Sequence, residues 1–148
     1  MTIPRGIRNN NPGNIRKSSV LWMRQAMPGS ALDKTDPDFV VFNGALYGLR
    51  ALALILWHYQ TLHGLKTLKG MIERFAPPEE NDTTTYVENA CKVCDVQPDN
   101  LFDLDTSNFY NLMVAIIHQE NGEQPYSSDL ISQAIQMARQ ADGPSTAG

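Results

Sequence analysis

The segment from Phe109 to Gly122 constrains the fold of this chain more than any other stretch. Its apolar residues recur at the i, i+3, i+4 and i+7 spacing of an amphipathic helix, and they are Phe109, Leu112, Met113, Ile116 and Ile117. Thr106 or Ser107 can cap the start of this helix, and Gly122 can end it in a left-handed conformation. A helix with such a face has to bury it, so we expect the other helices to pack around this one.

Glu120 is the polar residue that continues this apolar face. It follows Ile116 by four residues and Ile117 by three, so its side chain is expected to point toward the core. Burial disfavours the charged form of a carboxyl group, and a carboxylic acid that keeps its proton is what general acid catalysis requires. The alternative is that the helix simply ends here and Glu120 turns out into water, as happens at many helix ends.

Apolar spacing also predicts four further helices, over residues 44–63, 67–75, 82–94 and 127–139. Between residues 20 and 42, two short apolar runs flank a loop rich in turn-forming residues, which predicts a small β-hairpin. The expected fold class is therefore mainly α, an α+β arrangement of about five helices and one hairpin. The length of 148 residues suits one domain over residues 1–142, followed by a disordered tail over 143–148.

Charge and composition exclude several classes of protein. The net charge of -4 argues against a nucleic-acid-binding protein, which would carry a basic patch. The longest apolar run covers residues 51–57, which is too short to span a membrane, and the first residues do not resemble a signal peptide, so we expect synthesis in the cytoplasm. Cys91 and Cys94 lack a second cysteine pair, so we read them as reduced helix residues and predict neither a metal site nor a cofactor.

The N-terminal segment over residues 5–17 is unusually rich in asparagine. It contains Asn10, Asn11 and Asn14, a Pro-Gly turn signal and Arg16, a composition that predicts no regular helix or central strand. Amide groups both donate and accept hydrogen bonds, and sugar hydroxyl and N-acetyl groups need both. The segment therefore indicates a sugar-binding cleft wall, with a plain surface turn as the alternative.

Acidic side chains elsewhere provide further candidates for catalysis. Glu79 and Glu80 form an acidic corner with Asp82 and have no evident structural role, whereas Asp82 is also well placed to cap the helix that follows. The loop between the two predicted strands adds three weaker candidates, Asp33, Asp36 and Asp38.

Four segments together resemble small phage-borne and prophage-encoded proteins with a lysozyme-like domain. They read RGIRNNNPGNIRK, FNGALYGLRAL, IERFAPPEENDTTTYV and AIIHQENGEQPYS, and the resemblance covers about residues 5 to 138. A wider similarity is to soluble lytic transglycosylases, the goose-type branch of the lysozyme superfamily. In that family a helix ends in Glu-Ser-Gly and the glutamate is the catalytic acid; here the corresponding residues are Glu120, Asn121 and Gly122.

The resemblance implies roles for particular residues. It makes Glu120 the acid and places Tyr86 beside the site, although Phe75, Ala76 and Pro77 stand where the family has Tyr-Asn-Ala. The acid helix comes first in the family and near the end here, and a circular permutation would explain that order. It requires the N-terminal segment to pack beside Glu120.

Three functional hypotheses follow. In the first, the chain cleaves the bond between N-acetylmuramic acid and N-acetylglucosamine in a peptidoglycan strand, with Asn10, Asn11, Asn14, Arg16 and Tyr86 binding the sugar. It then acts at the cell wall or periplasm after release, injection or secretion, with virion or secretion-machine proteins as further partners. In the second, it is a non-catalytic virion or glycan-binding protein. In the third, Glu79, Glu80 and Asp82 form the catalytic site.

Overall fold

Five longer helices form the body of the structure and match the predicted helices closely. The computed structural model describes residues 2–141, and these helices are α2 (Ala45–Thr61), α3 (Leu68–Phe75), α4 (Thr83–Cys94), α5 (Thr106–Asn121) and α6 (Ser128–Gln140). The predicted mainly α class is confirmed. Residues 143–148, predicted to form a tail, lie outside the described part of the chain.

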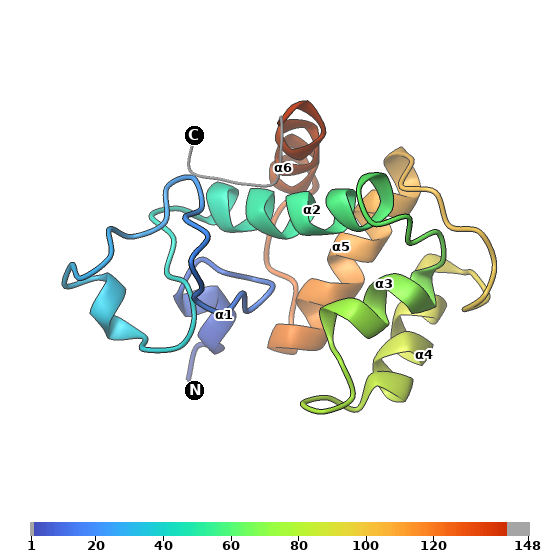
Figure 1. The fold of residues 1–148 in the computed structure, drawn as a ribbon, viewed down its shortest axis with the longest axis horizontal. Helices are drawn as coiled ribbons and strands as arrows, with labels where there is room; N and C mark the ends of the chain where they lie inside the picture. Colours follow the sequence, from blue (N-terminus) through green and yellow to red (C-terminus); the bar gives the residue numbers. More distant parts are fainter. Residues whose placement is uncertain (1, 142–148) are drawn as a thin grey trace.

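Helix α5 lies at the centre of the packing. Figure 1 shows α3 and α4 on one side of it and α1 with the N-terminal loops on the other. The apolar face predicted for α5 is fully buried: Phe109, Leu112, Met113, Ile116 and Ile117. Trp57 of α2 stacks on Phe109 with ring centroids 6.0 Å apart. Asp105, rather than Thr106 or Ser107, caps α5 by accepting a hydrogen bond from the Asn108 N–H.

Helix α2 is the most apolar element, and α6 packs mainly against it. Its leucines at positions 49, 52, 54 and 56 are all fully buried. An apolar surface this wide is buried on several sides, which explains why α2 runs across the whole helical body in Figure 1. Within residues 2–141, no helix has the combination of length and apolar character needed to cross a membrane.

The N-terminal region, residues 2–44, is mostly irregular. It contains one turn of helix, α1 (Arg5–Arg8), and a short 3-10 helix, η1 (Asp33–Thr35). The prediction that residues 5–17 contain no helix is wrong for this single turn. The turn closes because the Arg8 and Asn9 N–H groups bond to the carbonyls of Pro4 and Arg5.

The predicted hairpin between residues 20 and 42 is reduced to isolated contacts. The structure has antiparallel bridges between Arg16 and Phe39 and between Gln25 and Phe42, and no regular strand within residues 2–141. Part of the reason is that the asparagine-rich segment makes bonds that a partner strand would otherwise make. Asn11 Nδ2 donates to the Val40 carbonyl at 2.9 Å, and the Phe42 N–H donates to the carbonyl of Asn9 at 2.9 Å.

Candidate active site

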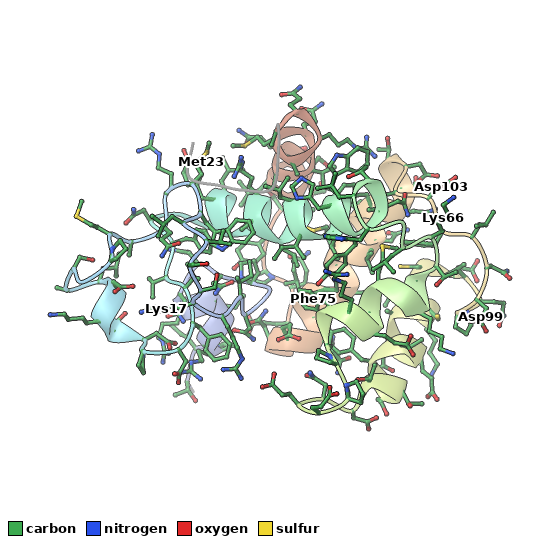
Figure 2. All side chains as sticks on the ribbon, in the orientation of Figure 1. Lys17, Met23, Lys66, Phe75, Asp99 and Asp103 are labelled. Atoms are coloured by element: carbon green, nitrogen blue, oxygen red, sulfur yellow. The ribbon has the colours of Figure 1, made fainter. Side chains whose placement is uncertain are left out.

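A cleft of about 360 Å³ opens where the N-terminal region meets the helical body. Its walls come from the N-terminal segment, α2, the end of α3 with the loop after it, and the end of α5. The lining residues are Gly13, Asn14, Ile15, Arg16, Phe39, Ile55, Tyr59, Phe75, Ala76, Glu80, Asn81 and Glu120. Figure 2 shows Phe75 at the end of α3 that faces the N-terminal region.

Glu120 lies on the wall of this cleft in the last turn of α5. The helix stops immediately after it because Gly122 adopts a left-handed conformation, with φ of 75°. Both carboxylate oxygens accept hydrogen bonds from distant parts of the chain: Oε1 from Asn14 Nδ2 and Oε2 from the Tyr86 hydroxyl, each at 2.9 Å. The side chain is only partly buried. Glu120 therefore neither points freely into water nor is sealed in the core.

Tyr86 donates its hydrogen bond to Glu120 from outside the cleft lining. It projects from α4 and is 3% exposed, so its ring contacts the core rather than the cleft. Burial, and next the negative charge of Glu120 and the hydrogen bond to it, raise the pKa of Tyr86 well above its usual value. The hydroxyl therefore stays protonated and acts as a fixed hydrogen-bond donor to Glu120.

Asn14 approaches Glu120 from the N-terminal segment with a backbone φ of 50°, a left-handed conformation that asparagine tolerates. Its amide nitrogen contacts Glu120, whereas its Oδ1 is buried without a hydrogen-bond partner. Asn121 Oδ1 is also buried without a partner, and both oxygens face Gly6, where a Cβ would clash with them. The amide pair is therefore incompletely satisfied beside the carboxyl group.

Asn121 links the N-terminal segment to the end of α5. The sequence did not single out this residue as a candidate for the site. Its Nδ2 donates to the carbonyls of Pro12 and Ile117, both at 2.9 Å. The signal available in the sequence is its position four residues after Ile117, where an amide at the end of an apolar face has to find buried partners.

The other predicted asparagines serve the fold of the N-terminal region. Asn11 is fully buried and bonds to the backbone of Ile15 and Val40. Asn10 donates to the carbonyl of Phe42 at 3.2 Å and has a φ of 53°. Of the residues predicted to bind sugar, Asn14 and Arg16 line the cleft, while Asn10, Asn11 and Tyr86 do not.

The structure separates the acidic candidates into different environments. Glu80 lines the cleft and faces Arg16 with an N···O distance of 3.7 Å. Asp82 lies outside the cleft lining and caps α4. It accepts hydrogen bonds from the Thr85 hydroxyl and from the Thr85 N–H. These bonds lower the pKa of Asp82, and the bond from the hydroxyl has the larger effect. Asp38 is exposed on the loop and lies outside the cleft lining.

Asp36 and Asp33 are engaged in holding the N-terminal region together. Asp36 is fully buried and accepts hydrogen bonds from Arg5 at 2.7 and 3.0 Å and from Asn9 at 2.8 Å. Asp33 pairs with Lys17 at 2.9 Å. Among the predicted partners of Glu120 in a two-carboxyl mechanism, Glu80 is thus the one in the cleft lining.

Three hollows are larger than this cleft: one of about 420 Å³ lies between α5 and α6, and two, of about 580 and 590 Å³, lie along α4. Glu88 lines both of the hollows along α4. Within residues 2–141, its carboxylate is not held by two side-chain donors as the carboxylate of Glu120 is. Cys91 borders one of these two hollows as a free thiol, and burial raises the pKa of neighbouring Cys94 to about 12. Within residues 2–141, no three His, Cys, Asp or Glu side chains gather as metal ligands.

Comparison with known proteins identifies a relative of the chain. No family model matches the sequence. Protein P5 of Pseudoalteromonas phage PM2 is 36% identical over 135 residues, which cover 89% of this chain and 80% of the phage protein. The chain belongs to the P5 family. This confirms the predicted kinship with phage proteins, and a phage relative fits a virion-associated protein; the lysozyme-like character of the P5-family domain stays a prediction.

Proposed function

We propose that this P5-family chain is a peptidoglycan-cleaving glycosidase with Glu120 as its acid. The observation that carries the proposal is that both oxygens of one partly exposed carboxyl group are held by side chains from two other segments at the wall of an open cleft. Glycosidases place such a carboxyl group beside the bond to be cleaved. The proposed bond joins N-acetylmuramic acid to N-acetylglucosamine, and the proposed fold is a circularly permuted lysozyme-like domain.

The surroundings of Glu120 favour a catalytic role over a structural one. A carboxylate that is buried for structural reasons is usually paired with a cation, as Asp36 is with Arg5. Within residues 2–141, Glu120 forms no ion pair within 4.0 Å and contacts neutral donors instead. The N-terminal segment also packs beside it, as the proposed permutation requires.

Asn14 can accommodate the protonated form of Glu120. An acid must carry its proton on one of the oxygens that now accept hydrogen bonds, and Asn14 Nδ2 cannot accept that proton. Rotating the Asn14 amide by half a turn would present its unpartnered Oδ1 to the Glu120 hydroxyl and turn its nitrogen toward the side of Asn121 Oδ1. The two amides therefore support both charge states of the carboxyl group.

The reaction begins with proton transfer from Glu120 to the glycosidic oxygen. In a lytic transglycosylase, the same carboxylate then helps the muramoyl 6-hydroxyl close an anhydro ring. A hydrolase needs a second carboxylate, ~5 Å away for retention or ~6.5–9.5 Å away for inversion. Glu80 is the available carboxyl group in the cleft lining, which also contains the aromatic residues Tyr59 and Phe75.

The decisive experiment compares the clearing of purified peptidoglycan by the wild-type chain and by Glu120→Gln. The matched control is Glu123→Gln, an exposed carboxyl group three residues further on. We expect Glu120→Gln to fold and lose at least 100-fold in rate, a typical contribution of general acid catalysis, while Glu123→Gln stays active. Equal activity in all three proteins would contradict the role of Glu120, and loss in Glu80→Gln alone would move the catalysis to the acidic corner.

Kinship with a phage protein favours one second candidate, a virion component that binds glycan without cleaving it. Binding of insoluble peptidoglycan with no release of soluble fragments by the wild-type chain would support it and reject the enzyme.

A further inference from the structure

Among the described residues that line the cleft, one ion pair links the N-terminal segment to the loop between α3 and α4. Arg16 belongs to the N-terminal segment and Glu80 to the loop between α3 and α4, and the Arg16 Nη2 atom lies 3.7 Å from Glu80 Oε1. Both side chains are 59% exposed. An exposed pair at this distance contributes little stability, so a competing charged group can replace either partner.

Arg16 also contacts the N-terminal region independently of Glu80. Its guanidinium lies over the Phe39 ring at 4.8 Å, and the backbones of the two residues form an antiparallel bridge. The Phe39 N–H in turn donates to buried Asp36 at 3.0 Å, and Arg5 lies over the same ring at 4.4 Å. The cation is therefore supported by contacts within the N-terminal region, whereas Glu80 belongs to the loop between α3 and α4.

The charges of the lining residues indicate which kind of ligand Arg16 can bind. Arg16 is the one cation among the residues that line the cleft, and Glu80 and Glu120 are its acidic groups. A neutral polymer of N-acetylglucosamine needs no cation at this position. A strand that carries free carboxylates needs one, because otherwise it meets only negative charge.

We propose that Arg16 binds a free carboxylate of the glycan substrate. When no substrate is bound, the carboxylate of Glu80 pairs with Arg16 instead. The inference rests on the proposed glycan-binding function and names its substrate class: strands whose sugar or peptide substituents bear carboxylates, as in peptidoglycan, rather than neutral chitin-like strands. Glu80 then acts as a competitor that an acidic strand displaces and a neutral strand does not.

The test measures affinity by calorimetry in the Glu120→Gln background, so that no probe is cleaved. The probes are a neutral pentamer of N-acetylglucosamine and a soluble muramic-acid oligomer with free carboxylates. We expect Arg16→Gln to weaken binding of the acidic oligomer about tenfold, the lower range for a hydrogen bond to a charged group, and Glu80→Gln to strengthen it. Neither change should alter binding of the neutral pentamer by more than about twofold.

Lys34→Gln is the matched control, because it removes one positive charge from an exposed position outside the cleft lining. Equal losses for both probes in Arg16→Gln, unchanged affinities, or no binding of the acidic oligomer would overturn the inference. Peptidoglycan clearing by the chain with Glu120 intact is measured separately. A carboxylate-dependent affinity without clearing would reject the proposed enzyme and leave the binding preference standing.

Discussion

The helical body and the N-terminal region are held together by different forces. In the body, residues 45–141, the large cluster of buried side chains is apolar. In the N-terminal region, residues 2–44, the buried set includes Asn9, Asn11 and Asp36, and the apolar cluster around Val40 and Phe42 is small. Apolar packing tolerates changes in detail, whereas a buried amide or carboxylate requires each partner at a fixed distance and direction.

This difference explains where the candidate site lies. Glu120 is supplied by the body, and Asn14 by the region whose backbone is fixed by buried polar bonds. The Asn14 amide and the Tyr86 hydroxyl each lie 2.9 Å from the carboxylate, the first positioned by the polar bonds of the N-terminal region and the second by the apolar packing of α4 on α5. Substitutions in each region should therefore have different consequences for stability.

Phe109→Ala tests the apolar body. The side chain is fully buried and stacks on Trp57. We expect a loss of about 3–5 kcal/mol in the free energy of unfolding, from lost transfer energy and the cavity left behind. Urea denaturation followed by circular dichroism measures it. Leu101→Ala, at a position 76% exposed, is the control and should change stability by less than about 0.5 kcal/mol.

Gly48→Ala tests the contact between the two regions. A Cβ at this position in α2 would overlap the carbonyl oxygen of Asn10, so the N-terminal segment has to move away. We expect a loss of about 3 kcal/mol, the upper range for overpacking, because the atom met is backbone. Alanine favours the helix itself by about 1 kcal/mol. Faster amide hydrogen exchange confined to residues 2–44 would show separation of the regions.

The control for this change is Gly44→Ala, where the new Cβ meets only Tyr47 at 3.6 Å. A more stable Gly48→Ala variant with unaltered exchange would mean that the two regions do not depend on this approach.

The pH dependence of stability at Asp36 tests the polar core of the N-terminal region. Burial alone would raise its pKa, but hydrogen bonds from Arg5, the Phe39 N–H and Asn9 lower it well below its usual range. A carboxyl group with a lowered pKa in the folded state contributes stability that is complete above about pH 4, its pKa in the unfolded chain, and is lost as the pH falls further.

We therefore expect Asp36→Asn to cost about 2 kcal/mol at pH 7 and progressively less toward pH 2, because below about pH 4 the unfolded wild-type chain takes up a proton that folded Asp36 does not bind. Urea midpoints from pH 2 to 7 measure this, with exposed Asp38→Asn as the control. A cost that stays constant with pH would show that charge at Asp36 is unimportant.

Asp82→Ala is expected to have the smallest effect, about 1 kcal/mol, because it removes the cap of α4. Asp82→Asn should retain most of the stability, since asparagine also caps. Thermal denaturation measures both. Loss of peptidoglycan clearing by a folded Asp82→Asn variant would instead restore Asp82 as a catalytic candidate.

The sequence by itself determined the helical body. Apolar spacing located α2 to α6 and their buried faces, and a local signal gave the cap at Asp82. These features are predictable because each depends on residues within a few positions of one another along the chain. Glu120 stood out for the same reason, as a carboxyl group on an apolar face.

Only the tertiary structure decided how the N-terminal region folds and what surrounds Glu120. Asparagines 10, 11 and 14 look alike in sequence, yet two bond to backbone carbonyls of the N-terminal region and Asn14 reaches a carboxylate 106 positions away. Tyr86 likewise meets Glu120 only through the packing of α4 on α5. A polar side chain's role depends on which donor or acceptor the fold brings within about 3 Å, and no local pattern encodes that distance.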